Sequence, residues 1–260
     1  MPPIIVLIAR ARDRLTLEAA LAAVGPVRAC GRADALAALA AGVGARLVVS
    51  ELRDGVGSSV VPVLAELACR ASAPAVLALA SLTDPGAADV LALAATRTPV
   101  QLVLRGVDDL AAAARAALSG RYDMEAALPI LERVGPLVPR SLGGWFVLAA
   151  ARASPWLKLA RAATLLGVGR RTIEGRLARA AFPPAHRVIG WCAALRACWR
   201  LDVLGQRPKQ VALALGFASH AALGNLLARY CGCSATALRD HGGFAGMRER
   251  FAAELDRPVS

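Results

Sequence analysis

Arginine side chains are concentrated in one part of the chain, and guanidinium groups favour contact with a polyanion. Residues 155–240 carry 13 basic and three acidic side chains, whereas residues 1–120 carry 11 basic and 10 acidic ones. The segment 155–240 therefore holds a net charge of +10, out of +12 for all 260 residues. Only Lys158 and Lys209 are lysines, and the forked guanidinium suits phosphates and guanine edges. This asymmetry indicates a nucleic acid or an anionic membrane as partner.

The distribution of the apolar residues argues against a protein that spans a membrane. Mean hydropathy is +0.50, but a spanning helix needs about 20 consecutive apolar residues. The longest uncharged run, residues 210–228, includes two glycines and the polar residues Gln210, Ser219, His220 and Asn225. The apolar run 4–9 follows no basic residue and is too short for the core of a signal peptide. We therefore expect a cytoplasmic protein with no membrane partner.

The sequence lacks the patterns of a metal site, a nucleotide site or a catalytic centre. Its six cysteines include no CxxC pair and no histidine at zinc spacing, and Cys231 and Cys233 alone do not make a zinc site. In the cytosol such cysteines are most simply buried thiols. No GxGxxG follows the first strand, no GxxxxGK[ST] occurs, and no paired carboxylates or Ser/His/Asp set stands out. We expect no enzyme, no metal and no cofactor.

The basic segment is expected to form two helix-turn-helix units joined by a longer helix. A serine-proline pair at 154–155 suits an N-cap and the first helical position. The expected short helices are 157–166 and 170–180 in the first unit, and 208–215 and 220–230 in the second. The joining helix starts at Pro183-Pro184, ends near residue 204, and carries one apolar stripe. The stripe consists of Val188, Cys192, Leu195 and Trp199.

Both units contain the same small-residue motif. Ala-x3-Gly occurs at 163–167 and again 49 residues later at 212–216. The alanine lets the two helices of a unit approach closely, and the glycine can adopt the positive φ of the turn. An apolar pair four residues apart follows each motif, at Ile173/Leu177 and at Leu223/Leu227. The tandem occurrence inside the basic segment supports a repeated unit.

These stretches resemble the DNA-binding domain of AraC/XylS-type transcriptional regulators. The resemblance rests on LLGVGRRTIEGRLARAAFPP and on QVALALGFASHAALGNLLARYCGCSATALRD, and covers about a third of the chain. It implies a seven-helix domain at 141–240 whose two recognition helices enter successive major-groove segments on one face of double-stranded DNA. Two positions depart from the family. Gly169 replaces the usual serine cap, and Gly175 stands where a basic or polar reader is common.

The resemblance also implies which side chains contact DNA. Arginine can read guanine and glutamate can accept from cytosine, while contacts to the DNA backbone supply most of the affinity and its salt dependence. Near base edges in the first unit it places Arg170, Arg171, Thr172 and Glu174, and near phosphates Arg176 and Arg179. In the second unit it places Ser219, His220 and Asn225 as readers, with Lys209 and Arg229 beside phosphate.

Residues 1–120 alternate apolar runs with helical segments rich in alanine and leucine. The runs are 4–8, 27–30, 47–49, 76–79 and 100–104, and the helices lie near 14–24, 33–41, 59–70, 86–95 and 108–118. This (βα)5 pattern predicts a doubly wound parallel sheet. Residues 121–140, with three prolines, are expected to be a linker, residues 142–153 to form the first helix of the second domain, and residues 241–260 to be a tail.

The order and length of the first domain resemble a response-regulator receiver domain. In that family, phosphotransfer needs an acidic pair after the first strand, an aspartate ending the third, a hydroxyl ending the fourth and a lysine ending the fifth. The acidic pair aligns here with Ala9 and Arg10, the aspartate with Glu51 and the lysine with Arg105, so the ligands for Mg²⁺ are missing. We expect no phosphorylation. Glu51 either imitates the phosphorylated state with a permanent charge against Arg10 or Arg105, or forms a simple ion pair.

Together these features predict a bacterial transcription regulator that recognises specific DNA sequences. Its receiver-like domain would bind a partner or form a homodimer, and its AraC-type domain would bind a promoter site. The alternative is a module that responds to a small ligand, with the N-terminal sheet as the sensor of an effector.

Overall fold

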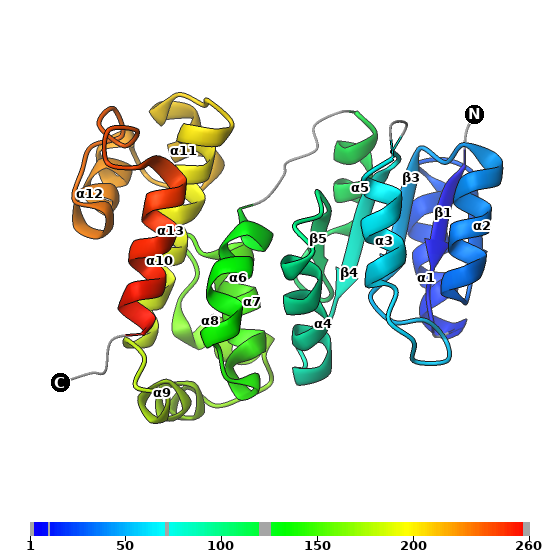
Figure 1. The fold of residues 1–260 in the computed structure, drawn as a ribbon, viewed down its shortest axis with the longest axis horizontal. Coiled ribbons are helices and arrows are strands. Elements are labelled where there is room, and N and C mark those ends of the chain that lie inside the picture. Colours follow the sequence, from blue (N-terminus) through cyan, green and yellow to red (C-terminus); the bar gives the residue numbers. More distant parts are fainter. Residues whose placement is uncertain (1–2, 10, 71–72, 120–125, 257–260) are drawn as a thin grey trace. The chain divides into compact units, whose positions relative to one another are not determined.

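The computed structural model describes residues 3–9, 11–70, 73–119 and 126–256. It divides into two units (Figure 1). Unit 1 comprises the described residues of 1–81 and 85–125, and unit 2 those of 82–84 and 126–260. Among these residues all strands of the sheet lie in unit 1, and unit 2 is helical. The predicted fold class, an α/β domain followed by an all-α domain, is confirmed.

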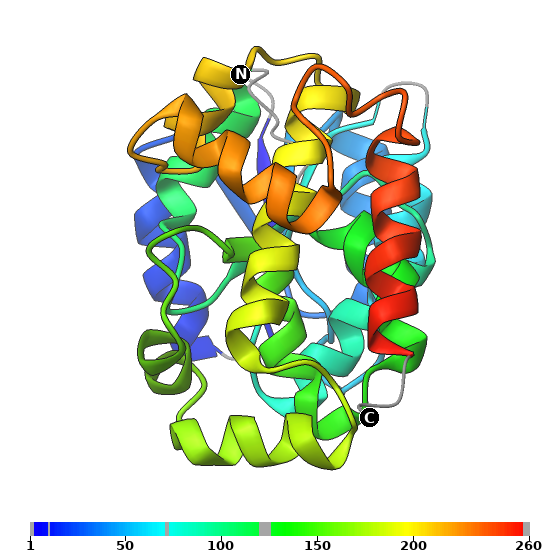
Figure 2. The ribbon, with the colours of Figure 1, turned by 90° about the vertical axis from the view of Figure 1, so that its left-hand side faces the viewer.

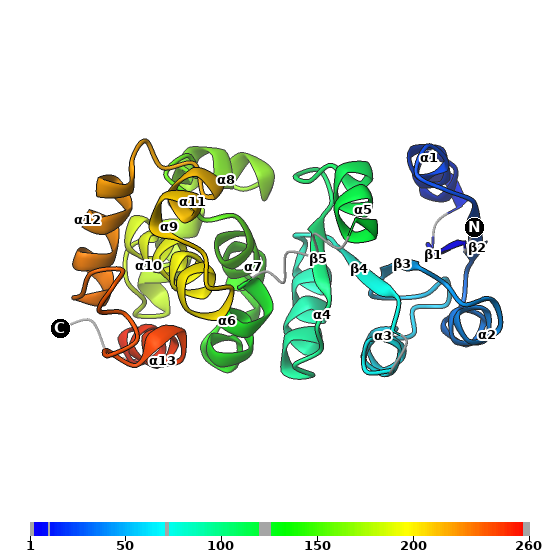
Figure 3. The same cartoon turned by 90° about the horizontal axis from the view of Figure 1, so that it is seen from above.

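Unit 1 is a five-stranded parallel sheet with the strand order β2-β1-β3-β4-β5, one of the two common doubly wound orders. The strands are β1 Ile4–Leu7, β2 Val27–Cys30, β3 Leu47–Glu51, β4 Ala75–Ala80 and β5 Gln101–Leu104. The helices are α1 Ala11–Ala22, α2 Ala33–Val43, α3 Val61–Ala68, α4 Asp84–Ala95 and α5 Leu110–Leu118. Helices α1 and α5 cover one face of the sheet, and α2, α3 and α4 cover the other (Figure 3).

The strands of unit 1 are apolar because helices cover both faces of the sheet. Val6 and Val49 are fully buried on the side of α1 and α5, in one cluster with Leu21 and Ala114. Because the five strands are parallel, their carboxyl ends lie at one edge of the sheet. There Glu51 ends β3 and Arg105 follows β5.

Unit 2 is arranged around α10 Ala185–Cys198, which a π-helical turn, Trp199–Val203, prolongs. The remaining helices are α6 Ala127–Val134, α7 Gly143–Arg152, α8 Leu159–Leu165, α9 Arg170–Arg179, α11 Pro208–Ala214, α12 His220–Cys231 and α13 Gly243–Leu255. Every residue of the predicted stripe, which runs along α10 to Trp199 in the π-helical turn, is at least 91% buried. In Figure 2 α10 runs through the centre of the unit beside α13. None of the helices in the described residues is both long and apolar enough to span a bilayer.

Two segments differ from the sequence-based expectation. Residues 127–134 of the expected linker form α6, and residues 243–255 of the expected tail form α13. Pro129 lies in the first turn of α6, where a missing N–H leaves no helical hydrogen bond unmade, so this proline does not break the helix. The ion pair between Arg248 and Glu132, 2.9 Å, and the one between Arg133 and Glu249, 2.8 Å, join α6 to α13. Residues 121–125 and 257–260 lie outside the described residues.

Candidate nucleic-acid interface

Helices α8 and α11, the first helices of the two predicted helix-turn-helix units, end in the same hydrogen-bonded turn. The Val168 N–H donates to the Ala163 carbonyl over 3.0 Å, and the Phe217 N–H donates to the Ala212 carbonyl over 2.8 Å. Gly167 and Gly216 follow each helix in the left-handed conformation, with φ of +64° and +75°. This is the glycine-ended Schellman turn. It explains why the glycine recurs four residues after the alanine: the alanine carbonyl accepts the longest hydrogen bond of the turn, and the glycine adopts the positive φ.

These turns fix the direction of α9 and α12. Ala163 and Ala212 are buried between the helices of their units. The inner face of α9 buries Ile173 and Leu177, and that of α12 buries Leu223 and Leu227. Figures 1 and 2 show α9 at one end of α10 and α12 at the other. The opposite, polar faces of both helices therefore stay exposed within unit 2.

The exposed face of α9 begins with a positive charge where a helix favours a negative one. Arg170 and Arg171 are its first two residues, and its first turn holds no acidic residue. Gly169 provides no side-chain cap, as its departure from the family pattern predicts. Because the N-terminus of a helix is itself positive, this arrangement disfavours the helix alone but suits an anionic partner. The exposed polar side chains of α9 are Arg170, Arg171, Thr172, Glu174 and Arg179.

Arg176 and Arg179, both expected near phosphates, have different surroundings. The Arg176 guanidinium is half-buried and donates to the Ser141 carbonyl over 2.7 Å. It thereby ties α9 to the 3-10 turn Arg140–Leu142. The exposed Arg179 donates only to the Gly175 carbonyl of its own helix, over 3.1 Å. The Arg176 guanidinium is thus tied to another segment of unit 2, whereas that of Arg179 stays on the surface of its own helix.

The second predicted helix-turn-helix, α11 and α12, presents fewer charged side chains, and its second helix has a side-chain cap. The Ser219 hydroxyl accepts the Ala222 N–H over 3.1 Å and caps α12. His220, Asn225 and Arg229 are exposed on α12, and Lys209 is exposed on α11. The guanidinium of Arg229 lies 5.5 Å from the centre of the Tyr230 ring, which orients it by a cation–π contact.

Two further side chains beside α12, Lys158 and His186, were not expected from the sequence. A cavity of about 490 Å³ lies between α12, α10 and the segment 154–159. Its lining includes Asn225 and Arg229 and also the exposed Lys158 and His186. No acidic residue lines it. Lys158 precedes α8 and His186 lies on α10. Only the fold brings these two side chains beside α12.

The end of α9 repeats the Schellman turn without glycine. The Phe182 N–H donates to the Leu177 carbonyl over 2.9 Å, and Ala181 has a φ of +54°. An L-residue other than glycine is strained in this conformation by roughly 1–2 kcal/mol. We expect Ala181→Gly to raise the free energy of unfolding of unit 2 by about 1 kcal/mol, measured by urea denaturation.

Ala180 is the matched control, because its φ is −84°. Ala180→Gly should destabilise unit 2 by about 0.5 kcal/mol through the larger freedom of glycine in the unfolded chain. A similar loss in both variants would mean that Ala181 is not strained.

The carboxyl edge of the sheet in unit 1 is closed by an ion pair. The Glu51 carboxylate contacts the Arg105 guanidinium and also accepts the Ala9 N–H. The side chain of Glu51 is 15% exposed. Arg10, the alternative partner, lies outside the described residues. Within those residues no group of three or more His, Cys, Asp or Glu side chains could hold a metal ion. Glu51 thus neutralises the cation at the end of β5.

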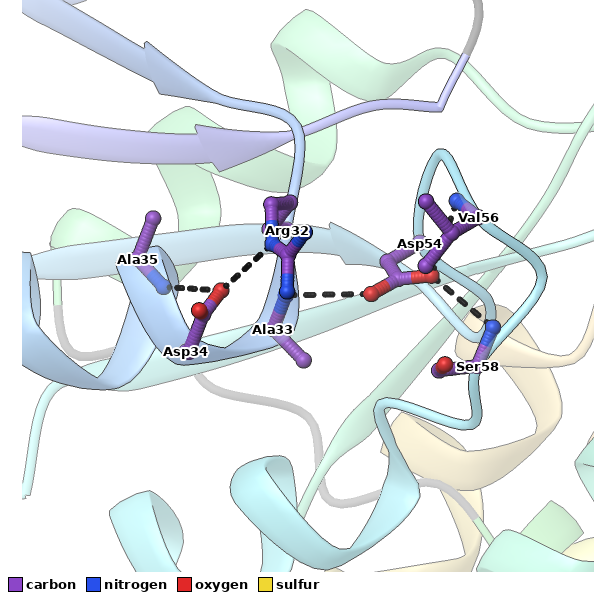
Figure 4. Close-up of polar contacts among 7 residues, drawn as sticks. All are labelled: Arg32, Ala33, Asp34, Ala35, Asp54, Val56 and Ser58. Atoms are coloured by element: carbon purple, nitrogen blue, oxygen red, sulfur yellow. Dashed lines mark hydrogen bonds and ion pairs between the residues drawn. The ribbon is translucent and has the colours of Figure 1, made fainter.

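Asp54 closes the loop that follows β3. Its buried carboxylate accepts the N–H groups of Ser58 at 2.8 Å, Val56 at 3.1 Å and Ala33 at 3.4 Å (Figure 4). The last of these is at the start of α2, so Asp54 joins the loop to that helix. Burial raises the pKa of Asp54, but the three hydrogen bonds outweigh it, and the pKa lies below its usual value. Asp54 therefore holds the loop after β3 against the start of α2.

The lowered pKa of Asp54 predicts acid sensitivity of unit 1. The unfolded chain binds a proton at Asp54 near pH 4, and the folded chain binds it only at lower pH. The carboxylate therefore stabilises the fold above about pH 4, and this stabilisation is lost as the pH falls through the folded-state pKa. Melting temperatures between pH 2 and 6 should fall less steeply in Asp54→Asn, which keeps an acceptor oxygen. Parallel curves for both proteins would contradict this role.

Comparison with protein-family models and with curated proteins finds no match. Among solved structures, the RcsB response regulator of Salmonella typhimurium is similar with 14% identity over 73% of this chain and 93% of that chain, at a TM-score of 0.39. Full-length FixJ from B. japonicum is similar with 18% identity over 90% of this chain and 98% of that chain, at a TM-score of 0.35. Both similarities concern the fold alone.

Proposed function

We propose that unit 2 binds double-stranded DNA in a sequence-specific way, as an AraC/XylS-type domain would. The observation that carries this proposal is the repeated turn, which presents the polar faces of α9 and α12 while their apolar faces are buried. An α-helix fits the major groove of B-DNA. The net charge of +10 on residues 155–240 supplies the attraction to phosphate.

The side chains divide into readers and positioning contacts. Arg170 and Arg171 begin α9 and are exposed, so they would reach base edges first, with Thr172 and Glu174 beside them. On α12 the readers would be His220 and Asn225, while Ser219 acts mainly as the cap. Contacts to phosphate would come from Arg179, Lys209 and Arg229, and from Lys158 at the cavity beside α12.

The salt dependence of binding tests this proposal. The intact chain is used to select sites from random duplex DNA, and the affinity for the selected site is then measured between 50 and 200 mM salt. With about four phosphate contacts, log K should fall with log salt at a slope of about −3 to −4. A flat dependence, or no selected sequence, would overturn the proposal.

We further infer that unit 1 regulates DNA binding without phosphotransfer, through dimerisation or a partner. The Glu51–Arg105 contact supports this, because the permanent negative charge of Glu51 already pairs with the Arg105 guanidinium at the carboxyl edge of the sheet. No phosphate is needed to supply that charge. Together the two units would make a transcription regulator.

Glu51→Gln tests this permanent charge. The amide can still accept the Ala9 N–H but loses the ion pair, so we expect a loss of about 1 kcal/mol in the stability of unit 1. If the charge also holds the DNA-binding state, affinity for the selected site should fall about fivefold or more. Thermal denaturation and a binding titration measure the two effects. Unchanged stability and affinity would leave Glu51 without a regulatory role.

A further inference from the structure

Two thiols meet where the joining helix and the second recognition helix end. Cys198 is the last residue of α10, and Cys231 is the last residue of α12. Their sulfur atoms are 3.6 Å apart, and both residues are at least 99% buried. Both are free cysteines in the structure. Although 33 positions separate them along the chain, the fold places their side chains in contact.

We propose that Cys198 and Cys231 are a site of reversible oxidation, at which a hydroperoxide converts the two thiols into a disulfide linking α10 to α12. A disulfide has an S–S length of about 2.05 Å, so the sulfurs must approach by about 1.5 Å. Cys231 ends α12 and is followed by Gly232 in the left-handed conformation, whereas Cys198 lies where α10 passes into the π-helical turn. The end of α12 can therefore adjust more easily than a helix interior.

The surroundings assign different roles to the two thiols. A hydrogen bond from the Cys198 thiol lowers the pKa of Cys231; burial opposes this, and the charge of Arg250 favours it. The same hydrogen bond, together with burial, raises the pKa of Cys198. Cys231 is thus the thiol that ionises first, and only the thiolate attacks an oxidant. The Arg250 guanidinium is held nearby, since it donates to the Cys231 carbonyl over 2.9 Å.

The reaction balances with hydrogen peroxide as the oxidant. The Cys231 thiolate attacks one peroxide oxygen and breaks the O–O bond, which forms a sulfenic acid and releases hydroxide. The Cys198 sulfur then attacks the sulfenic sulfur, forms the S–S bond, and the hydroxyl group leaves as water once the Cys198 proton has been transferred. In total two thiols and one peroxide give one disulfide and two waters.

A disulfide at this site would fix the end of a recognition helix. It would close a loop of more than 30 residues between α10 and α12, which contains α11 and the whole second helix-turn-helix unit. Closing such a loop restricts the unfolded chain and stabilises the fold. Any change in DNA affinity that follows rests on the proposed function, but formation of the bond does not.

The experiment treats the intact folded chain with hydrogen peroxide, alkylates the remaining thiols and maps the peptides by mass spectrometry. We expect a Cys198–Cys231 link that lowers the mass by two hydrogens, raises the melting temperature by several degrees and disappears on reduction. Cys192→Ser is the matched control: Cys192 is also buried in α10, about 9 Å from Cys198 along the helix axis, and this variant should still form the link. Cys231→Ser should not, and Cys231→Ala provides the same test if a buried hydroxyl destabilises the fold.

Three results would overturn the proposal. One is oxidation of the exposed Cys69 while Cys198 and Cys231 remain reduced. Another is a link from Cys198 to Cys233, the buried thiol two residues after Cys231. The third is a Cys198–Cys231 link that forms only after denaturation. Since all three are read from peptide masses, a failure here is distinct from a failure of DNA binding.

Discussion

Arg171→Ala is expected to weaken binding to the selected duplex by about 10- to 100-fold, which corresponds to roughly 1–3 kcal/mol for one arginine at a base edge. Arg171 is exposed at the start of α9, where no acidic residue balances it. Its removal should therefore leave the stability of unit 2 unchanged or slightly raised, because a cation is unfavourable at a helix N-terminus. Fluorescence anisotropy at fixed salt gives the affinity, and urea denaturation gives the stability.

Arg115→Ala is the matched control, since it removes the same charge from an exposed position on α5 of unit 1. It should change the affinity less than twofold at moderate salt, because the proposed DNA contacts all lie on unit 2 and salt screens other surface charges. Arg176→Ala makes a second comparison: it removes the hydrogen bond to the Ser141 carbonyl and should cost about 1 kcal/mol of stability. Equal losses of affinity in Arg171→Ala and Arg115→Ala would show that α9 does not read bases.

Phe251→Ala is expected to destabilise unit 2 by about 3–5 kcal/mol, the usual cost of truncating a fully buried aromatic residue. Phe251 lies on α13 and is completely buried. Its ring stacks on that of Trp191 in α10, with 5.7 Å between ring centres. The Trp191 indole N–H donates to Glu254, one turn further along α13, over 2.7 Å. Chemical denaturation of the intact chain, followed by tryptophan fluorescence, measures the loss.

Ala253→Ser is the control for a substitution on α13 that removes no buried side chain. Ala253 is exposed, and surface substitutions of this kind usually change stability by less than about 0.5 kcal/mol. A loss below 1 kcal/mol for Phe251→Ala would mean that α13 is not part of the core. A loss in the expected range would make α13 essential to the frame that supports α12, and truncation before residue 243 should then impair DNA binding as well.

Much of this fold follows from local sequence patterns. The apolar runs predicted the five strands, and their alternation with helical segments predicted a parallel sheet. The Ala-x3-Gly repeats predicted the two turns, because only glycine adopts a positive φ there without strain. Each of these signals is contained within about 15 residues, so no knowledge of distant partners was needed.

The segments that differed from expectation depend on distant partners. The segment 241–260 carries as many acidic as basic side chains, which is typical of an exposed tail. Its apolar residues nevertheless recur at helical spacing, at Phe244, Met247, Phe251 and Leu255. The three prolines of residues 121–140 indicated a linker, although residues 127–134 form α6. Helix α6 packs on α7 and α13, and α13 packs on α10 and α6. The sequence does not indicate these contacts, which bury the apolar side chains of both helices.

The sequence by itself determined the five strands, most of the helices, the two glycine turns and where the positive charge is concentrated, since propensity, periodicity and composition are local properties. Only the tertiary structure decided that Arg176 binds the Ser141 carbonyl, that Glu51 pairs with Arg105 and that Cys198 touches Cys231. Each of these contacts joins residues 33 to 54 positions apart. Such pairs form when the packing of whole elements brings their side chains together. The order of the strands indicated Arg105 as one of two partners for Glu51, whereas the local sequence did not indicate the other two contacts.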